Sequence, residues 1–225
     1  MAAAGLGAGR GAVGARGVGL GLARLLLGCS LLLGQVAAQA YSDGTVESWV
    51  KIGNNGQGGL SSSLGDKNYF GSSIAEIGDL DGDNITDVAV GARSVKQLYI
   101  LFLKADGTVK AEHVLGASDV PGAATTFGAS VASLGDLDGD GVVDLAVGAI
   151  GMRKNGFEDI DAGGVYILFL NTDGSLKAAQ LIADNTTVGV TAPLTHTLDA
   201  SDSFGKSVAA LGDLDGDGVI DLAVR

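Results

Sequence analysis

Short apolar runs recur through residues 41–225 and are separated by turns rich in glycine and aspartate. The clearest group is a run of small residues at 88–92, a bulkier run at 98–103 and a half-alternating run at 108–115. Runs of this length, bounded by turn residues, predict β-strands. Because no stretch keeps the helical period of about 3.6 residues, the pattern predicts an all-β fold.

The same order of runs occurs a second time, at 145–149, 165–170 and 175–182, and begins a third time at 222–224. A Phe-Gly pair opens each copy, and in both complete copies an Asp-Gly pair marks a tight turn before the last run. The copies are 57 and 77 residues apart, and two ten-residue insertions in polar connections account for the difference. Four short strands per copy predict blades of a β-propeller, about three in residues 41–225.

The two kinds of apolar run predict different positions within a blade. The small residues at 88–92 and 145–149 suit an inner position, where the backbones of neighbouring blades crowd around an axis. The aromatic and aliphatic runs at 98–103 and 165–170 suit the packing between blades. Residues 43–52 have the pattern of the hairpin end of an earlier unit.

A nine-residue aspartate motif precedes each run of small residues, at 79–87, 136–144 and 213–221. Aspartate fills positions 1, 3, 5 and 9, where alternate short side chains of a tight turn converge on one point. Position 7 would add a backbone carbonyl, and position 6, which is asparagine or glycine, must tolerate positive φ. The predicted ligands are Asp79, Asp81, Asp83, Ile85 and Asp87; Asp136, Asp138, Asp140, Val142 and Asp144; and Asp213, Asp215, Asp217, Val219 and Asp221.

Four carboxylates within nine residues repel one another unless a cation lies among them. A carboxylate-rich set selects Ca²⁺ over zinc and copper, which prefer histidine or cysteine, and over Mg²⁺, whose small octahedron fits poorly. The loop is not an EF-hand, because position 12 is valine where that motif needs a bidentate glutamate. Aspartate and glycine also favour turns in general, but turns do not require four acids at one spacing three times. The motif therefore predicts three structural Ca²⁺ sites in β-hairpins.

The Phe-Gly start, the aspartate loop and the Gly-Ala after the next strand resemble FG-GAP repeats, which build the N-terminal propeller of integrin α chains. The resemblance covers nearly all of residues 41–225, although Arg93 and Ile150 replace the proline of the family's Gly-Ala-Pro. It implies a seven-bladed propeller, of which about three units are present. We therefore expect a chain truncated at its C-terminus, with ring completion by self-association as the alternative.

The first 40 residues differ from the rest of the chain. They hold three arginines, no acidic residue and an apolar run at 25–36, followed by the small-x-small sequence at 38–40. The run is shorter than the roughly 20 residues of a transmembrane helix, so residues 1–40 are predicted to be a secretory signal peptide. An organelle transit peptide and a bacterial lipoprotein signal ending at Cys29 are the alternatives.

The charge balance restricts the partners. The chain has 14 Lys and Arg against 26 Asp and Glu, a net charge of −12. Without the three arginines of residues 1–40 the balance is 11 against 26, or −15. An acidic chain without a basic stripe argues against nucleic acid or an anionic membrane surface as partner. The single cysteine, Cys29, lies in the segment predicted to be removed, so no disulfide is expected.

Other candidate residues are fewer. Asn185 begins an N-glycosylation sequon in a polar insertion, whereas the sequon at Asn84 lies inside a metal loop. His113 and His196 are isolated and are expected at the surface or in caps. The acidic insertion at 152–164 is expected to be a solvated loop, with contact to a partner as the alternative. No catalytic constellation is evident, so an enzyme is not expected.

The sequence therefore predicts a secreted or cell-surface calcium-binding protein that acts in adhesion or ligand recognition. Its partner would be an extracellular protein or a glycan, and no transmembrane span is expected in this chain. A carbohydrate-binding propeller lectin and an accessory module of a secreted hydrolase are the alternatives, because a fold alone does not name a ligand.

Overall fold

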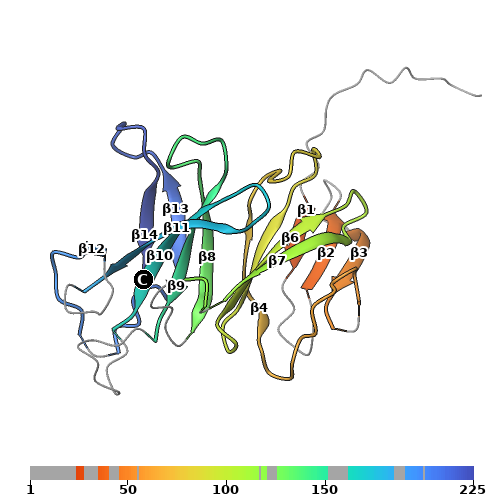
Figure 1. Ribbon diagram of the computed structural model, residues 1–225, viewed down its shortest axis with the longest axis horizontal. Helices are drawn as coiled ribbons and strands as arrows, with labels where there is room; N and C mark the ends of the chain where they lie inside the picture. The colour runs from red at the N-terminus through yellow and green to blue at the C-terminus, as the bar shows by residue number, and fades with distance from the viewer. Residues whose placement is uncertain are drawn as a thin grey trace, which may run out of the picture.

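The computed structural model describes residues 24–27, 35–40, 46–54, 56–116, 118–120, 126–151, 162–184, 191–199 and 201–225. In this part of the chain every regular element is a β-strand, which confirms the predicted all-β fold (Figure 1). Arg93 and Ile150, where the Gly-Ala-Pro proline is missing, directly follow the strands that hold the Gly-Ala pairs.

The first complete unit is a four-stranded antiparallel sheet. It consists of β4 (Phe70–Glu76), β5 (Val88–Ala92), β6 (Gln97–Leu103) and β7 (Val109–Leu115), paired in that order. Each strand pairs with the next one along the chain, as expected of a propeller blade. The runs at 88–92, 98–103 and 108–115 thus form strands within one residue of the predicted bounds.

The second unit repeats this sheet and extends it. Its strands are β8 (Phe127–Gly135), β9 (Asp144–Ala149), β10 (Gly164–Leu170), β11 (Leu176–Ala183) and β12 (Ala192–Pro193). The four predicted strands pair antiparallel in chain order, and the two-residue β12, which was not predicted, adds a fifth strand that pairs in parallel with β11. β12 thus forms one edge of the sheet.

Two smaller sheets flank these units. The third unit holds the antiparallel pair β13 (Val208–Gly212) and β14 (Asp221–Val224). The N-terminal sheet consists of β1 (Arg24–Leu27), β2 (Gln35–Ala40) and β3 (Val46–Ile52). Removal of residues 1–40 stays a prediction, and it would take away the strand that pairs with β3.

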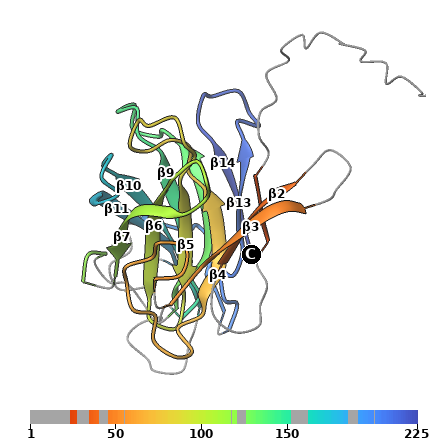
Figure 2. The same ribbon diagram turned by 90° about the vertical axis from the view of Figure 1, so that its right-hand side faces the viewer.

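The units stand side by side. β8 lies between β4 on one side and β13 on the other, so the first strands of the three units are neighbours (Figure 1). Figure 2, together with the first view, places β2 and β3 on the far side of the first unit from β10 and β11.

The third strand of each complete unit is buried on both faces. Leu98, Ile100 and Phe102 of β6 lie in one apolar cluster with Tyr166 and Leu168 of β10. The alternate residues of β6 lie in a second cluster, which includes Ile52, Leu60 and Leu64. Because side chains of a strand alternate between its faces, β6 must be apolar throughout. This arrangement confirms that the bulkier runs pack between units.

The strands of small residues bring their backbones close to the next unit. A Cβ atom on Gly91 of β5 would lie 2.1 Å from the carbonyl oxygen of Gly128 in the next unit. The second junction is the same, because a Cβ atom on Gly148 would lie 1.9 Å from the carbonyl oxygen of Gly205. This crowding confirms that the small residues let neighbouring backbones approach each other, whereas their inner position around an axis stays a prediction. β5 and β9 are the second strands of their sheets.

Candidate metal centres

Each aspartate motif forms the loop between the first two strands of its unit. The loops follow β4, β8 and β13 and lead directly into β5, β9 and β14. All three lie at the same end of the molecule (Figure 1). Equivalent turns of the three units thus lie at one end of the molecule.

The aspartate at position 1 organises the backbone of the loop. In the first loop one oxygen of Asp79 accepts hydrogen bonds from the backbone N–H groups of Gly82 and Asp83, at 2.8 and 2.9 Å. The other oxygen accepts from the N–H group of Asn84 at 2.7 Å. Asp136 and Asp213 make the same three bonds in their own loops. One short side chain therefore closes each turn.

Position 6 adopts the conformation that the sequence predicted. Its φ angle is 63° at Asn84, 86° at Gly141 and 87° at Gly218. Asparagine and glycine tolerate this left-handed region better than other residues do. The local geometry of all three loops is thus the same.

The aspartate at position 9 ties the loop to the third strand. Asp87 is fully buried, and its two oxygens accept hydrogen bonds from the N–H groups of Leu80 and Leu103, at 3.0 and 2.9 Å. Asp144 is equally buried and accepts from Leu137 at 2.8 Å and Leu170 at 3.4 Å. Leu103 and Leu170 end the third strands of their sheets.

Three carboxylates meet in each loop. One oxygen from each of positions 1, 3 and 9 lies within 4.8 Å of the others. These groups are Asp79, Asp81 and Asp87; Asp136, Asp138 and Asp144; and Asp213, Asp215 and Asp221.

The remaining predicted ligands lie in the same loops. At position 5, Asp83, Asp140 and Asp217 each accept a hydrogen bond of 2.8 Å from the N–H group of position 7, which is Ile85, Val142 or Val219. The carbonyl of position 7 as a ligand stays a prediction.

Two lysines, which the sequence reasoning missed, reach into the first two loops. The ammonium nitrogen of Lys110 lies 2.6 Å from an oxygen of Asp81 and also contacts Asp83. The ammonium nitrogen of Lys177 lies 2.7 Å from Asp138 and 2.6 Å from Asp140. A sequence signal was present, since both lysines follow the glycine of the Asp-Gly turn by three residues.

The carboxylates of a loop differ in their electrostatic environment. The hydrogen bond from Lys110 holds the pKa of Asp83 below its usual value, and Lys177 does the same for Asp140. Burial raises the pKa of Asp87 and Asp144, and the neighbouring aspartates add to the effect. A buried carboxylate among like charges is costly to ionise unless a cation lies beside it. The donor set, three converging carboxylates of which one is buried in the first two loops, fits a hard divalent cation.

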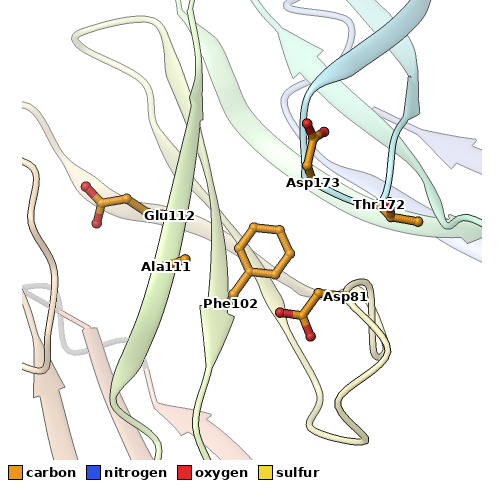
Figure 3. Close-up of a pocket in the computed structure, with 6 residues that line it drawn as sticks. All are labelled: Asp81, Phe102, Ala111, Glu112, Thr172 and Asp173. Carbon is orange, nitrogen blue, oxygen red and sulfur yellow. The ribbon is translucent and has the colours of Figure 1, made fainter.

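A pocket of about 360 Å³ lies beside the first loop, between the two complete units. Figure 3 shows Phe102 and Ala111 on one wall, with Thr172 and Asp173 opposite. Its carboxylates are already engaged: Glu112 accepts hydrogen bonds from Ser61 and Ser62, and Asp173 accepts from Ser175. Asp81 is bound by Lys110. These bonds brace the turns around the pocket and give no indication of a small-molecule ligand.

The other candidate residues contribute little to a site. Asn185 and residues 152–161 lie outside the described residues. His113 lies in β7, and the ring of His196 contacts the hydroxyl of Thr195 at 3.1 Å. Among the described residues, no helix has the length and hydropathy that a membrane crossing requires.

Comparison with known proteins points to one family. Residues 79–147, from the first aspartate loop to β9, match the FG-GAP-like repeat. The chain is 27% identical to integrin alpha-4 of Xenopus laevis over 169 residues and 32% identical to integrin alpha-3 of Cricetulus griseus over 163 residues. It is 34% identical to integrin alpha-IIb of Homo sapiens over 160 residues.

Each of these three matches covers 69% of this chain but only 14% of the integrin. The chain thus corresponds to a small part of these relatives. Residues 79–147, which match the family model, contain the first two aspartate loops and strands β5 to β8. The chain is therefore an FG-GAP repeat protein, distantly related to the N-terminal propeller region of integrin alpha chains.

Proposed function

We propose that this protein is an extracellular, calcium-binding FG-GAP repeat protein that acts in adhesion or ligand recognition, without catalysis of its own. The observation that carries the proposal is the threefold grouping of carboxylates from positions 1, 3 and 9. In two of the loops the third carboxylate, Asp87 or Asp144, is buried. An ionised buried carboxylate favours a bound cation strongly.

Calcium would add a further link between parts of a blade that hydrogen bonds, ion pairs and apolar packing already join. Asp79 and Asp81 lie within the loop, whereas Asp87 directly precedes β5. Asp87 also accepts a hydrogen bond from the N–H group of Leu103 at the end of β6. An ion held by all three would fasten the first turn of the sheet to its third strand. It would also neutralise the buried charge of Asp87.

The expected gain in stability is substantial. Extracellular calcium modules bind with a Kd of about 0.1 mM, so about 1 mM free Ca²⁺ would stabilise each site by about 1.4 kcal/mol. Three independent sites would contribute about 4 kcal/mol, which is comparable to the whole stability of a small domain.

The role in adhesion or recognition is supported by kinship with integrin alpha chains. The three loops lie at one end of the molecule (Figure 1). Bound calcium would therefore also make the turns at that end more rigid. Binding residues are often carried on loops that a rigid scaffold holds in place. An extracellular protein or glycan is the partner that this arrangement suits.

Calorimetric titration with Ca²⁺ tests the proposal. We expect three bound ions, and a Tm that falls by about 10 °C when EDTA removes them, since about 1 kcal/mol corresponds to 2–4 °C for a chain of this size. The matched variants Asp81→Asn, Asp138→Asn and Asp215→Asn should each lose one ion. Absence of binding heat together with a Tm insensitive to EDTA would rule out the calcium sites.

Adhesion requires a separate measurement. The purified protein should retain an extracellular matrix protein or a glycan on an array in Ca²⁺ and release it in EDTA. A protein that binds calcium but retains no ligand under either condition would contradict the recognition role while leaving the metal sites intact.

A further inference from the structure

The two lysines that enter the metal loops occupy the same irregular position in their sheets. Leu103 pairs with Val109 and Phe102 pairs with Ala111, so Lys110 is the extra residue of a β-bulge. In the second unit Leu170 pairs with Leu176 and Phe169 with Ala178. Lys177 is therefore the extra residue of an equivalent bulge.

A bulge changes the direction of the side chain that it carries. In a regular strand Lys110 would pair across the sheet with a residue of β6. In the bulge it has no such partner, and its ammonium group lies against Asp81 and Asp83 instead. Lys177 makes the same two contacts, with positions 3 and 5 of the second loop. Both complete units therefore have a bulge whose lysine side chain contacts positions 3 and 5 of the aspartate loop.

The position-3 carboxylate has two roles in this arrangement. Asp81 belongs to the group of three that fits a divalent ion, and it is also bound by Lys110 at 2.6 Å. Figure 3 shows Asp81 beside Phe102, the residue at which the bulge begins. An ammonium group and a divalent ion that share one carboxylate repel each other over a few ångströms.

We propose that Lys110 and Lys177 are built-in counter-cations that compete with the divalent ion for the position-3 carboxylates. Each lysine lowers the calcium affinity of its loop. In the absence of the ion, the same lysine neutralises the exposed aspartates and keeps the loop closed. This inference rests on the calcium binding proposed above and assigns the residue that sets its strength.

Single-site titrations give a direct test. In a chain that carries Asp81→Asn and Asp215→Asn, only the second loop binds calcium, and the further change Lys177→Met should tighten that site about tenfold. The reciprocal variant, which carries Asp138→Asn and Asp215→Asn, leaves only the first loop able to bind calcium and tests Lys110→Met there. Lys177→Arg keeps the charge and should leave the affinity close to that of lysine. Lys206→Met, an exposed lysine ahead of β13, controls for net charge.

Thermal unfolding separates competition from a merely structural role. In EDTA, Lys110→Met and Lys177→Met should lower Tm by about 3 °C each, because the aspartates lose their counter-cation. In saturating Ca²⁺ the same variants should be at least as stable as the parent chain. The change of sign between the two conditions is the signature of competition.

Three results would overturn the inference. If the chain binds calcium and neither lysine substitution changes the affinity, the competition is refuted and the calcium sites remain. A loss of Tm of the same size in EDTA and in calcium would make the lysines ordinary structural residues. Absence of calcium binding in every chain would remove the proposed calcium sites together with the competition.

Discussion

The second and third aspartate loops differ at one of nine positions, where Val143 corresponds to Ile220. Their backbones are closed by the same hydrogen bonds to position 1 and by the same positive φ at position 6. Their surroundings differ. Asp144 is 1% exposed, whereas Asp221 is half-buried. The same motif therefore forms the same loop in two different environments.

The difference comes from the strands that follow. In the second unit, β10 supplies the N–H group of Leu170 to Asp144, and β11 supplies Lys177 to positions 3 and 5. Within residues 1–225 no strand follows β14, and Asp221 accepts its hydrogen bond from Leu214 of its own loop. The motif determines the shape of the loop. The neighbouring strands bury the carboxylate at position 9 and supply the lysine that balances the charge at positions 3 and 5.

The largest expected effect tests whether the third unit docks as the second does. Gly148→Ala places a methyl group against Gly205 of the third unit, and Gly91→Ala does the same at the first junction. Each should cost about 3 kcal/mol in the free energy of unfolding, because two backbones must move apart. Urea denaturation measures the cost, with Gly65→Ala, where nothing lies within 4 Å, as the control. Tolerance of Gly148→Ala alone would show that the third unit docks loosely.

The next effect compares the two aspartates at position 9. Asp144→Ala leaves the N–H groups of Leu137 and Leu170 without their acceptor and should cost about 2 kcal/mol. Asp221→Ala removes the acceptor of one N–H group in an open position and should cost about 1 kcal/mol or less. Denaturation in EDTA keeps metal binding out of the comparison. Equal losses at the two sites would mean that the third strand adds nothing to the loop.

The smallest effect concerns position 7, which is valine in both loops. Val142 is 9% exposed and Val219 is 54% exposed. Val142→Ala should cost about 1.5 kcal/mol, since two buried methyl groups are lost, and Val219→Ala should change stability by less than about 0.5 kcal/mol. Paired denaturation curves sharpen the comparison, and a large loss at Val219 would indicate a buried environment that this structure does not have.

Local patterns were sufficient to predict much of the fold and of the loops. Strand bounds, the glycine-mediated contact of neighbouring units and the positive φ at Asn84 and its counterparts follow from residue size, alternation and turn chemistry. Each of these depends on residues close together in the sequence or on a period repeated along it. The carboxylates of positions 1, 3 and 9 converge for the same reason, because a nine-residue turn brings them together.

Other features depend on residues that meet only when the sheet is assembled. Strand order and register decide the pairing of β12 and the burial of Asp144. One bulge decides the direction of the Lys177 side chain. Lys177 lies 37 residues from Asp140, and its position three residues after the glycine of the Asp-Gly turn does not by itself identify the loop that it contacts. Its role follows from the pairing of β10 with β11, since a one-residue shift in register decides which side chain meets the loop.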